Sequence, residues 1–371
     1  MQHPLKRSFI REILEHTSHD TISFAGGLPD VSLFPHEALQ ASTIKALEEP
    51  ESLQYSTSTG YTPLKEQIAK RYSEQGFPTR SENILITSGS QQGLDIISRY
   101  HHGSSVCVEV PSYLGALNLF ALNQMDVDSV ALGEEGIDLS AFAHSMPKNK
   151  LAYLIPDFQN PSGTCYDDAH RKEVAKILHT NDTLLIEDAP YSELYFDRAH
   201  ESISQHIPTQ SYHLGSFSKV LAPAFRIGWI RADTKLLEPL IAYKEAMDLH
   251  TSSITQRMVS AYLEETEHFE AHLASLRDAY QNKMHYFAKQ LAIHLPSFTF
   301  TPPKGGMFIY GKLNGVDTMA LVRRCLEQGV VFVPGVEFGG ANDEIRFNFT
   351  HSSFREIEEG LKRLKKVLDK I

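Results

Sequence analysis

Short β-branched runs alternate with helical patterns through the middle of the chain, and this alternation limits the possible folds more than any other feature. Five runs have the composition of buried parallel strands: residues 84–87, 105–110, 152–155, 184–187 and 226–230. Helical patterns separate several of them, over residues 91–101, 113–123 and 167–179. Strands and helices in alternation predict an α/β domain with a mostly parallel central sheet. Residues that follow such strands are candidates for a ligand site.

The last third of the chain has a different pattern. Two or three long helical patterns run from residue 234 to 294, and prolines at 296, 302 and 303 end them. A small α+β unit is predicted next, with strands at 307–310, 330–333 and 344–350 and helices at 318–328 and 354–368. We therefore predict a large domain over 41–265 and a small α+β domain made of 1–40 and 266–371.

Composition limits the class of protein and its partners. The chain has 371 residues, which predicts about two domains. Its formal net charge of −11 argues against nucleic acid and anionic membrane surfaces as partners. Its three cysteines form no CxxC pair. Residues 1–20 lack the continuous apolar run that a signal peptide requires, and no run of about 18 apolar residues occurs in the sequence. We expect a cytoplasmic protein that spans no membrane.

A metal site has little support in the sequence. His268 and His272 stand four residues apart on a predicted helix, as two metal ligands can. The residue after His268 is Phe269, where the zinc-protease pattern has glutamate, and no third ligand is evident. We expect a solvated helix face there and no bound metal.

One lysine lies among residues that suit a phosphate group. Lys219 occurs in GSFSKVLAPAFRIGW, with Ser216 and Ser218 before it and Arg226 seven residues after it. Hydroxyls and a planar guanidinium are good donors to a phosphate dianion. A lysine beside a phosphate-anchored aldehyde can form a Schiff base. The pattern predicts pyridoxal 5'-phosphate as the cofactor.

This cofactor requires partners for its ring. Its pyridine nitrogen stays protonated only beside an anion, and Asp188 ends the predicted strand in TLLIEDAP. Its phenolic oxygen needs hydrogen-bond donors. Asn160 in PDFQNPSG and Tyr191 in EDAPYSELY follow neighbouring strands and are candidates for that role.

The phosphate and the face of the ring need further groups. The segment ITSGSQQGLD opens a predicted helix, and the amides at such a helix start bind phosphate. The candidates are Gly89, Ser90 and Gln91. Tyr113 in VPSY follows another predicted strand and is a candidate to stack on the ring.

Motifs along nearly the whole chain resemble the fold type I pyridoxal phosphate enzymes, specifically the class I/II aminotransferases. In the family's order these are SFAGGLPD, QYSTSTGYTPLKEQIA, ITSGSQQGLD, VPSY, PDFQNPSG, EDAPY, SFSK, PKGGMFIY and IRFNFT. The chain is most similar to the 2-aminoadipate and kynurenine aminotransferase group. It also resembles the catalytic domain of MocR-type regulators.

The resemblance implies a fold type I large domain, with helices on both sides of the sheet, and roles for single residues. Lys219 would form the Schiff base and Asp188 would face the pyridine nitrogen. Asn160 and Tyr191 would donate to the ring oxygen, and Tyr191 would count among the catalytic groups. The phosphate would be held by Ser90, Gln91, Ser216, Ser218 and Arg226.

Further roles follow from the same resemblance. Arg346 in IRFNFT would bind the substrate α-carboxylate, assisted by Gly27 and Asn160. Tyr55 would reach the phosphate of the other subunit, which implies a homodimer with active sites at the subunit interface. Arg11 would lie near the substrate side chain.

These residues predict an enzyme that moves an α-amino group between an amino acid and a 2-oxo acid, with glutamate and 2-oxoglutarate as one pair. A lyase or decarboxylase on the same scaffold is the alternative enzyme, because the cofactor alone does not select the bond that breaks. A MocR-type regulatory sensor that binds the cofactor without turnover is the non-enzyme alternative. We expect no DNA-binding helix-turn-helix before the catalytic segment, and the acidic charge also disfavours this reading.

Overall fold

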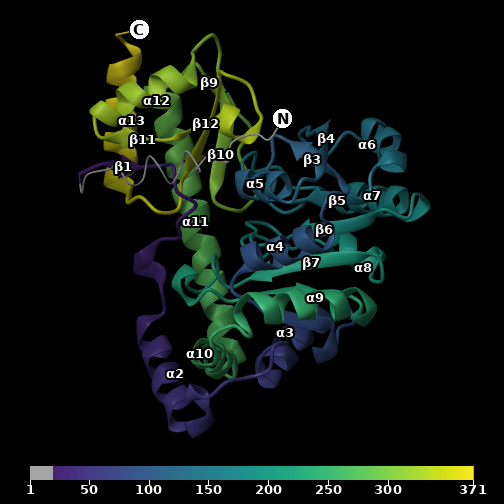
Figure 1. The fold of residues 1–371 in the computed structure, drawn as a ribbon. Coiled ribbons are helices and arrows are strands. Elements are labelled where there is room, and N and C mark those ends of the chain that lie inside the picture. Colours follow the sequence, from purple (N-terminus) through teal and green to yellow (C-terminus); the bar gives the residue numbers. More distant parts are fainter. Residues whose placement is uncertain (1–19, 371) are drawn as a thin grey trace.

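A seven-stranded sheet forms the centre of the computed structural model, which describes residues 20–370 (Figure 1). The strand order is β2-β8-β7-β6-β5-β3-β4. The bounds are β2 (Ile84–Thr87), β3 (Ser105–Val110), β4 (Asp126–Ala131), β5 (Leu151–Leu154), β6 (Leu184–Asp188), β7 (Ser211–Ser216) and β8 (Gly228–Arg231). Every residue of β2, β5 and β7 is buried, as expected for strands covered on both faces. Strands β4 and β7 were not predicted from the sequence.

The sheet is mostly parallel, as predicted, but one side of it is not. β7, β6, β5, β3 and β4 pair in parallel, whereas β8 is antiparallel to both β7 and β2. The prediction of a parallel strand at 226–230 was therefore wrong, because β8 runs against the rest of the sheet. β2 runs in the same direction as β7, although it pairs only with the antiparallel β8. Between β7 and β8 lies only a 3-10 turn (Pro223–Phe225), and parallel neighbours need a longer crossover connection.

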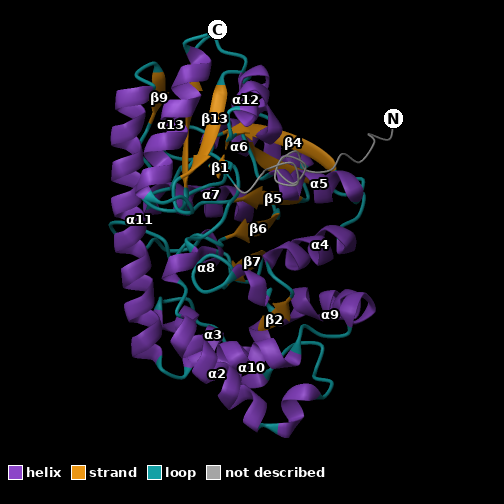
Figure 2. Cartoon of the chain, turned by 90° about the vertical axis from the view of Figure 1, so that its left-hand side faces the viewer, coloured by secondary structure: helices purple, strands orange, loops and turns teal. Residues whose placement is uncertain are grey.

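Helices cover both faces of this sheet. Figure 2 shows α4 (Ser90–Tyr100), α5 (Leu114–Leu122) and α9 (Thr234–Asp248) on one side. The opposite side carries α7 (Asp168–Thr180) and α8 (Ile203–His206). The other helices before the C-terminal unit are α2 (His36–Glu48), α3 (Thr62–Glu74), α6 (Leu139–Ser145) and α10 (Ser253–Leu263).

A smaller antiparallel sheet lies at the other end of the molecule, in the order β12-β13-β10-β9. The bounds of this unit are β9 (Phe298–Phe300), β10 (Phe308–Leu313), α12 (Thr318–Glu327), β11 (Val330–Val331), β12 (Val333–Pro334), β13 (Glu344–Asn348) and α13 (Phe354–Leu368). The predicted strand at 330–333 is divided between β11 and β12. The long helix α11 (Thr266–His294) runs alongside both sheets (Figure 1).

The first described residues join this C-terminal unit. β1 (Ile22–Ser23) pairs in parallel with β11. Phe24 is fully buried and meets Phe287 and Phe347 edge to face, at centroid distances of 5.1 and 6.0 Å. This packing brings residues 25–28 to the space between the two sheets. Every helix within residues 20–370 is too short or too polar to span a lipid bilayer.

Candidate active site

A cavity of about 770 Å³ lies beyond the carboxyl ends of β5, β6 and β7, where an α/β sheet places its ligands. Most of the predicted site residues line it. They are Gly27, Ser90, Gln91, Tyr113, Asn160, Asp188, Tyr191, Ser216, Ser218, Lys219, Arg226 and Arg346.

Lys219 follows β7 and extends toward the N-terminal segment. Its Nζ donates a hydrogen bond to the Gly27 carbonyl at 2.7 Å. Burial lowers the pKa of Lys219 to about 8, and the positive charges of Arg346 and Arg226 act in the same direction. A much larger fraction of this amine is neutral near pH 7 than for an ordinary lysine. A neutral amine is the form that attacks an aldehyde.

Asp188 ends β6 and presents one satisfied and one unsatisfied oxygen. Its Oδ2 accepts a hydrogen bond from the buried Tyr153 hydroxyl at 2.8 Å. Its Oδ1 is buried without a hydrogen-bond partner among the described residues. Burial raises the pKa of Asp188 to about 6, while Tyr153 and Lys219 oppose the shift. An unpartnered buried carboxylate oxygen fits the protonated ring nitrogen of pyridoxal phosphate.

Asn160, in the loop after β5, and Tyr191, three residues after β6, lie together beside Arg346. The Asn160 Oδ1 accepts from Arg346 Nη1 at 2.7 Å, and its Nδ2 donates to the Tyr191 hydroxyl at 3.3 Å. Both side chains are buried. Burial raises the pKa of Tyr191, so its hydroxyl stays protonated and can donate to a ligand oxygen.

Arg346 comes from β13 of the smaller sheet and is 2% exposed. Its guanidinium lies over the rings of Phe308 and Phe338, at 4.4 and 4.8 Å from their centroids, and it also donates to the Ala25 carbonyl. Among the described residues no carboxylate pairs with it, and its Nε has no hydrogen-bond partner. Burial lowers the pKa of Arg346 to about 10. A buried cation without a counter-ion is costly unless an anionic ligand pairs with it.

The opposite end of the cavity suits a phosphate group. Ser216 and Ser218 share a hydrogen bond at 2.9 Å, and Arg226 Nη1 lies 3.5 Å from the Ser218 hydroxyl oxygen. Gly89 precedes α4 with φ 83°, and a Cβ there would lie 2.4 Å from Arg226 Nη2. Glycine thus lets the guanidinium approach the backbone at the start of α4. Gly89 adjoins the cavity, whereas Ser90 and Gln91 line it.

The aromatic candidates differ in position. Tyr113 precedes α5, lines the cavity and donates from its hydroxyl to Gln91 Oε1 at 3.0 Å. Tyr55 is 79% exposed, packs edge to face on His250 at 5.8 Å and lies outside the cavity of its own chain. Arg11 lies outside the described residues.

Sequence reasoning missed several groups that shape the site. Tyr153 reads as an ordinary core residue of a strand, and no spacing indicates its contact with Asp188. Phe308 lies within the quoted motif PKGGMFIY, but nothing in that motif indicates its contact with Arg346. Phe338 and the Ala25 carbonyl have no sequence signal, because their roles depend on the docking of distant segments.

Comparison with known proteins gives the family. Residues 20–364 match the family described as aminotransferase class I and II. A 2-aminoadipate transaminase from Thermus thermophilus is 36% identical over 98% of this chain and 94% of its own. An aromatic-amino-acid aminotransferase from Thermococcus litoralis is 34% identical over 97% of this chain and 91% of its own.

Solved structures agree. The alpha-aminoadipate aminotransferase of Thermus thermophilus, complexed with N-(5'-phosphopyridoxyl)-L-leucine, matches with a TM-score of 0.91 and 35% identity, over 99% of this chain and 95% of that one. The Pyrococcus horikoshii kynurenine aminotransferase matches with a TM-score of 0.91 and 32% identity, with the same coverage. The predicted fold and family are thereby confirmed. The chain belongs to the class I and II aminotransferases, and it is a fold type I, pyridoxal phosphate-dependent enzyme that transfers an amino group between an amino acid and a 2-oxo acid.

Proposed function

We propose that this aminotransferase binds the α-carboxylate of its amino acid on Arg346 and uses Lys219 as the base, with glutamate and 2-oxoglutarate as one substrate pair. The observation that carries the proposal is the buried Arg346 guanidinium, which lines the same cavity as Lys219 and pairs with no carboxylate among residues 20–370. A planar guanidinium binds a carboxylate through two parallel hydrogen bonds. Gly27 and Asn160 adjoin this position and would assist the binding.

The cofactor roles follow from the same geometry. When bound, pyridoxal phosphate supplies an aldehyde for an amine and a cationic ring that withdraws electrons from the substrate α-carbon. Asp188 would hold the proton on the ring nitrogen with its free Oδ1, and Asn160 and Tyr191 would donate to the ring oxygen. The phosphate would be bound by the groups at its own end of the cavity, and Tyr113 would stack on the ring. Those groups are the amides after Gly89, together with Ser90, Gln91, Ser216, Ser218 and Arg226.

Lys219 would move the proton. Its lowered pKa, about 8, suits a base that takes a proton from the substrate α-carbon and returns it nearby, because such groups work best with a pKa near the working pH. Its contact with the Gly27 carbonyl holds the amine at the side of the cavity where Arg346 would fix the substrate.

The amino donor we propose is 2-aminoadipate or an aromatic amino acid. The support is the pair of similar enzymes with those names and the large volume of the cavity. Arg11 would contact the donor side chain. A spectral titration of the purified enzyme with acidic, aromatic and branched amino acids identifies the donor, because conversion of the cofactor to its amine form changes its absorbance.

We also propose a cytoplasmic homodimer. The exposed Tyr55 would reach the phosphate site of the partner subunit. Apolar side chains near it are exposed as well, with Leu53 at 77% and Leu249 at 49%. Such exposure is typical of a surface that a second copy covers. Sedimentation of the holoenzyme gives a dimer mass under this proposal, and a stable monomer contradicts it. We propose in addition that residues 41–265 form the large domain and that residues 1–40 and 266–371 form the small domain.

The decisive experiment for the function is Lys219→Ala. We expect this variant to lose amino transfer to 2-oxoglutarate by about 10³-fold or more while still binding the cofactor. Normal transamination by the variant overturns the proposed role. Release of pyruvate or carbon dioxide by the wild type, without amino transfer, would favour the lyase or decarboxylase, and specific retention of DNA on filters would favour the regulatory sensor.

A further inference from the structure

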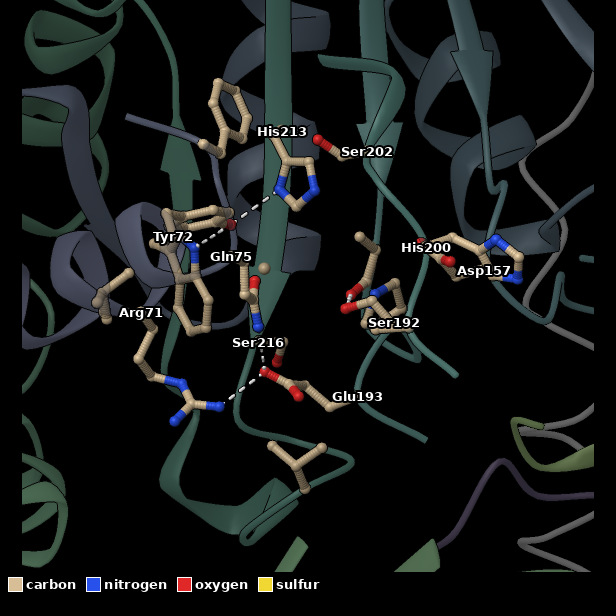
Figure 3. A pocket seen from close by; sticks show the side chains of 18 of the residues that line it. Arg71, Tyr72, Gln75, Asp157, Ser192, Glu193, His200, Ser202, His213 and Ser216 are labelled. Atoms are coloured by element: carbon tan, nitrogen blue, oxygen red, sulfur yellow. Dashed lines mark hydrogen bonds and ion pairs between the residues drawn. The ribbon is translucent and has the colours of Figure 1, made fainter. Parts of the chain in front are cut away.

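A second cavity, of about 280 Å³, adjoins the active site (Figure 3). Its walls come from α3, the ends of β7 and β8, and the segment that follows β6. Pro190 and Ser216 line both cavities, whereas Lys219, Asp188 and Arg346 line only the active-site cavity. The second cavity is therefore a neighbouring space. Ser216 is the one residue in its walls that the proposed mechanism also uses.

A chain of hydrogen bonds ends at this cavity. The indole Nε1 of Trp229 donates to the Tyr72 hydroxyl at 2.8 Å, and that hydroxyl lies 2.8 Å from His213 Nδ1. An indole N–H only donates, so the Tyr72 oxygen accepts it. Among the described residues His213 Nδ1 is the only other partner of that hydroxyl, so we assign the hydroxyl hydrogen to Nδ1. Burial lowers the pKa of His213, which favours the neutral ring. The assigned tautomer therefore carries its hydrogen on Nε2.

This Nε2–H is aimed into the cavity. Figure 3 shows the bonded edge of the His213 ring facing Tyr72, with the other ring nitrogen on the side of Ser202. His213 is 6% exposed, and Nε2 has no hydrogen-bond partner within the described part of the chain. An unpartnered donor on a largely buried side chain, directed into a cavity, indicates a ligand atom that accepts a hydrogen bond.

The walls beside His213 are aromatic. Trp229 and Phe217 lie 4.9 Å apart between ring centroids. Trp229 packs against the β7 backbone, because a Cβ on Gly215 would lie 2.2 Å from its ring. These surfaces suit a flat ring more than an alkyl chain.

The other end of the cavity is acidic. Arg71 binds Glu193 at 2.8 Å and Glu270 at 2.5 Å, so one guanidinium is shared by two carboxylates. Glu193 lines the cavity, as does Asp157, whose Oδ1 accepts from Arg171 at 2.7 Å. Each of these two carboxylates has a second oxygen that accepts no hydrogen bond from residues 20–370. These free carboxylate oxygens can only accept hydrogen bonds. They therefore favour a cationic ligand group and disfavour an anionic one.

We infer that this cavity is a second binding site, for a small aromatic ligand with an acceptor oxygen at one end and a cationic nitrogen at the other. The oxygen accepts from His213 Nε2–H. The ring packs between Trp229 and the opposite wall. The cationic nitrogen pairs with Glu193.

The test uses 4-hydroxybenzamidine as the probe and the holoenzyme as the protein. Trp229 is the only tryptophan of the chain, so its fluorescence reports on this cavity. We expect a saturable change with a dissociation constant of about 1 mM or below. The probe has no α-carboxylate for Arg346, so the cofactor absorbance should stay constant. A 4-hydroxybenzoate control has the same ring with the opposite charge and should bind at least about tenfold more weakly.

Three variants test whether the probe binds in this cavity. Glu193→Gln should weaken the binding of 4-hydroxybenzamidine about tenfold. Ala199→Phe, on an exposed loop at the cavity wall, should abolish binding by filling the space without adding an indole. Glu135→Gln, an exposed acid that does not line the cavity, should leave the affinity unchanged. The inference is overturned by no fluorescence response, by equal binding of 4-hydroxybenzoate, by a response that tracks the cofactor absorbance, or by unchanged binding in a folded Ala199→Phe variant.

Discussion

The two ends of the active-site cavity are built in different ways. At the cofactor end, Asp188, Ser216 and Lys219 lie on or just after adjacent strands of one sheet, so a single core positions them. At the carboxylate end, Arg346 comes from the smaller sheet and is held by Asn160, in the loop after β5, and by the Ala25 carbonyl. The positions of these cofactor-end residues therefore depend on one sheet. The carboxylate end exists only when three distant segments dock.

The charged groups at the two ends also differ in the partners that they have. Asp188 has the Tyr153 hydroxyl as a partner and lies near the cation of Lys219. Arg346 has only neutral partners among the described residues, namely a side-chain amide oxygen, a carbonyl and two aromatic rings. We therefore expect changes at the first end to alter the cofactor and its chemistry. Changes at the second end should alter the affinity for substrate and leave the cofactor in place.

Asp188→Asn is the change with the largest expected effect. An amide cannot keep the ring nitrogen protonated, and a lost buried charge pair costs about 2 to 5 kcal/mol. We expect kcat to fall about 10³-fold and cofactor affinity to weaken, measured by steady-state amino transfer and by titration of the cofactor-free protein. Asp126→Asn, at an exposed position of β4, is the matched control. An unchanged kcat would remove Asp188 from the mechanism.

Arg346→Gln tests the other end. Glutamine keeps some hydrogen-bonding capacity but has no charge for the α-carboxylate, so we expect KM to rise about 10²-fold. The absorbance of the bound cofactor should not change. The exposed Arg324→Gln is the control. Loss of the cofactor together with the substrate would show that the two ends are not independent.

Tyr153→Phe should have a smaller effect. It removes the hydroxyl that holds Asp188 Oδ2, which lets burial raise the pKa of Asp188 further. We expect kcat to fall about tenfold, consistent with the loss of one hydrogen bond to a charged group. The pH profile of kcat should lose activity at a higher pH than in the wild type as the medium is acidified. An unshifted profile would contradict this role of Tyr153.

An effect of about the same size is a pH dependence of the rate of cofactor binding in the unaltered protein. The pKa of Lys219 is lowered to about 8, so its neutral fraction rises about tenfold between pH 7 and pH 9. The rate at which the cofactor-free protein takes up pyridoxal phosphate should rise through the same range and level off above it. An inflection near the ordinary lysine value of 10.5 would show that the pKa of Lys219 is not lowered.

The contrast between the ends also explains what the sequence could predict. Asp188, Lys219 and Arg226 lie in short continuous motifs after strands, and parallel strands bring their carboxyl ends together, so their proximity follows from the pattern. The direction of β8 was missed because its apolar run reads the same in either orientation. Tyr153 and Phe338 were missed because their contacts arise only from packing between elements distant in sequence. Tyr55 was predicted to act across a subunit interface, and its exposed position in one chain leaves that role as a proposal.

The central claim is that Lys219 carries the cofactor, and it can be tested chemically. Reduction of the holoenzyme with borohydride, followed by proteolysis and mass spectrometry, fixes the cofactor on whichever lysine holds it. We predict a phosphopyridoxyl group on the peptide that contains Lys219, with the exposed Lys235 unmodified as an internal reference. A label on another lysine, or none on Lys219, would contradict the account.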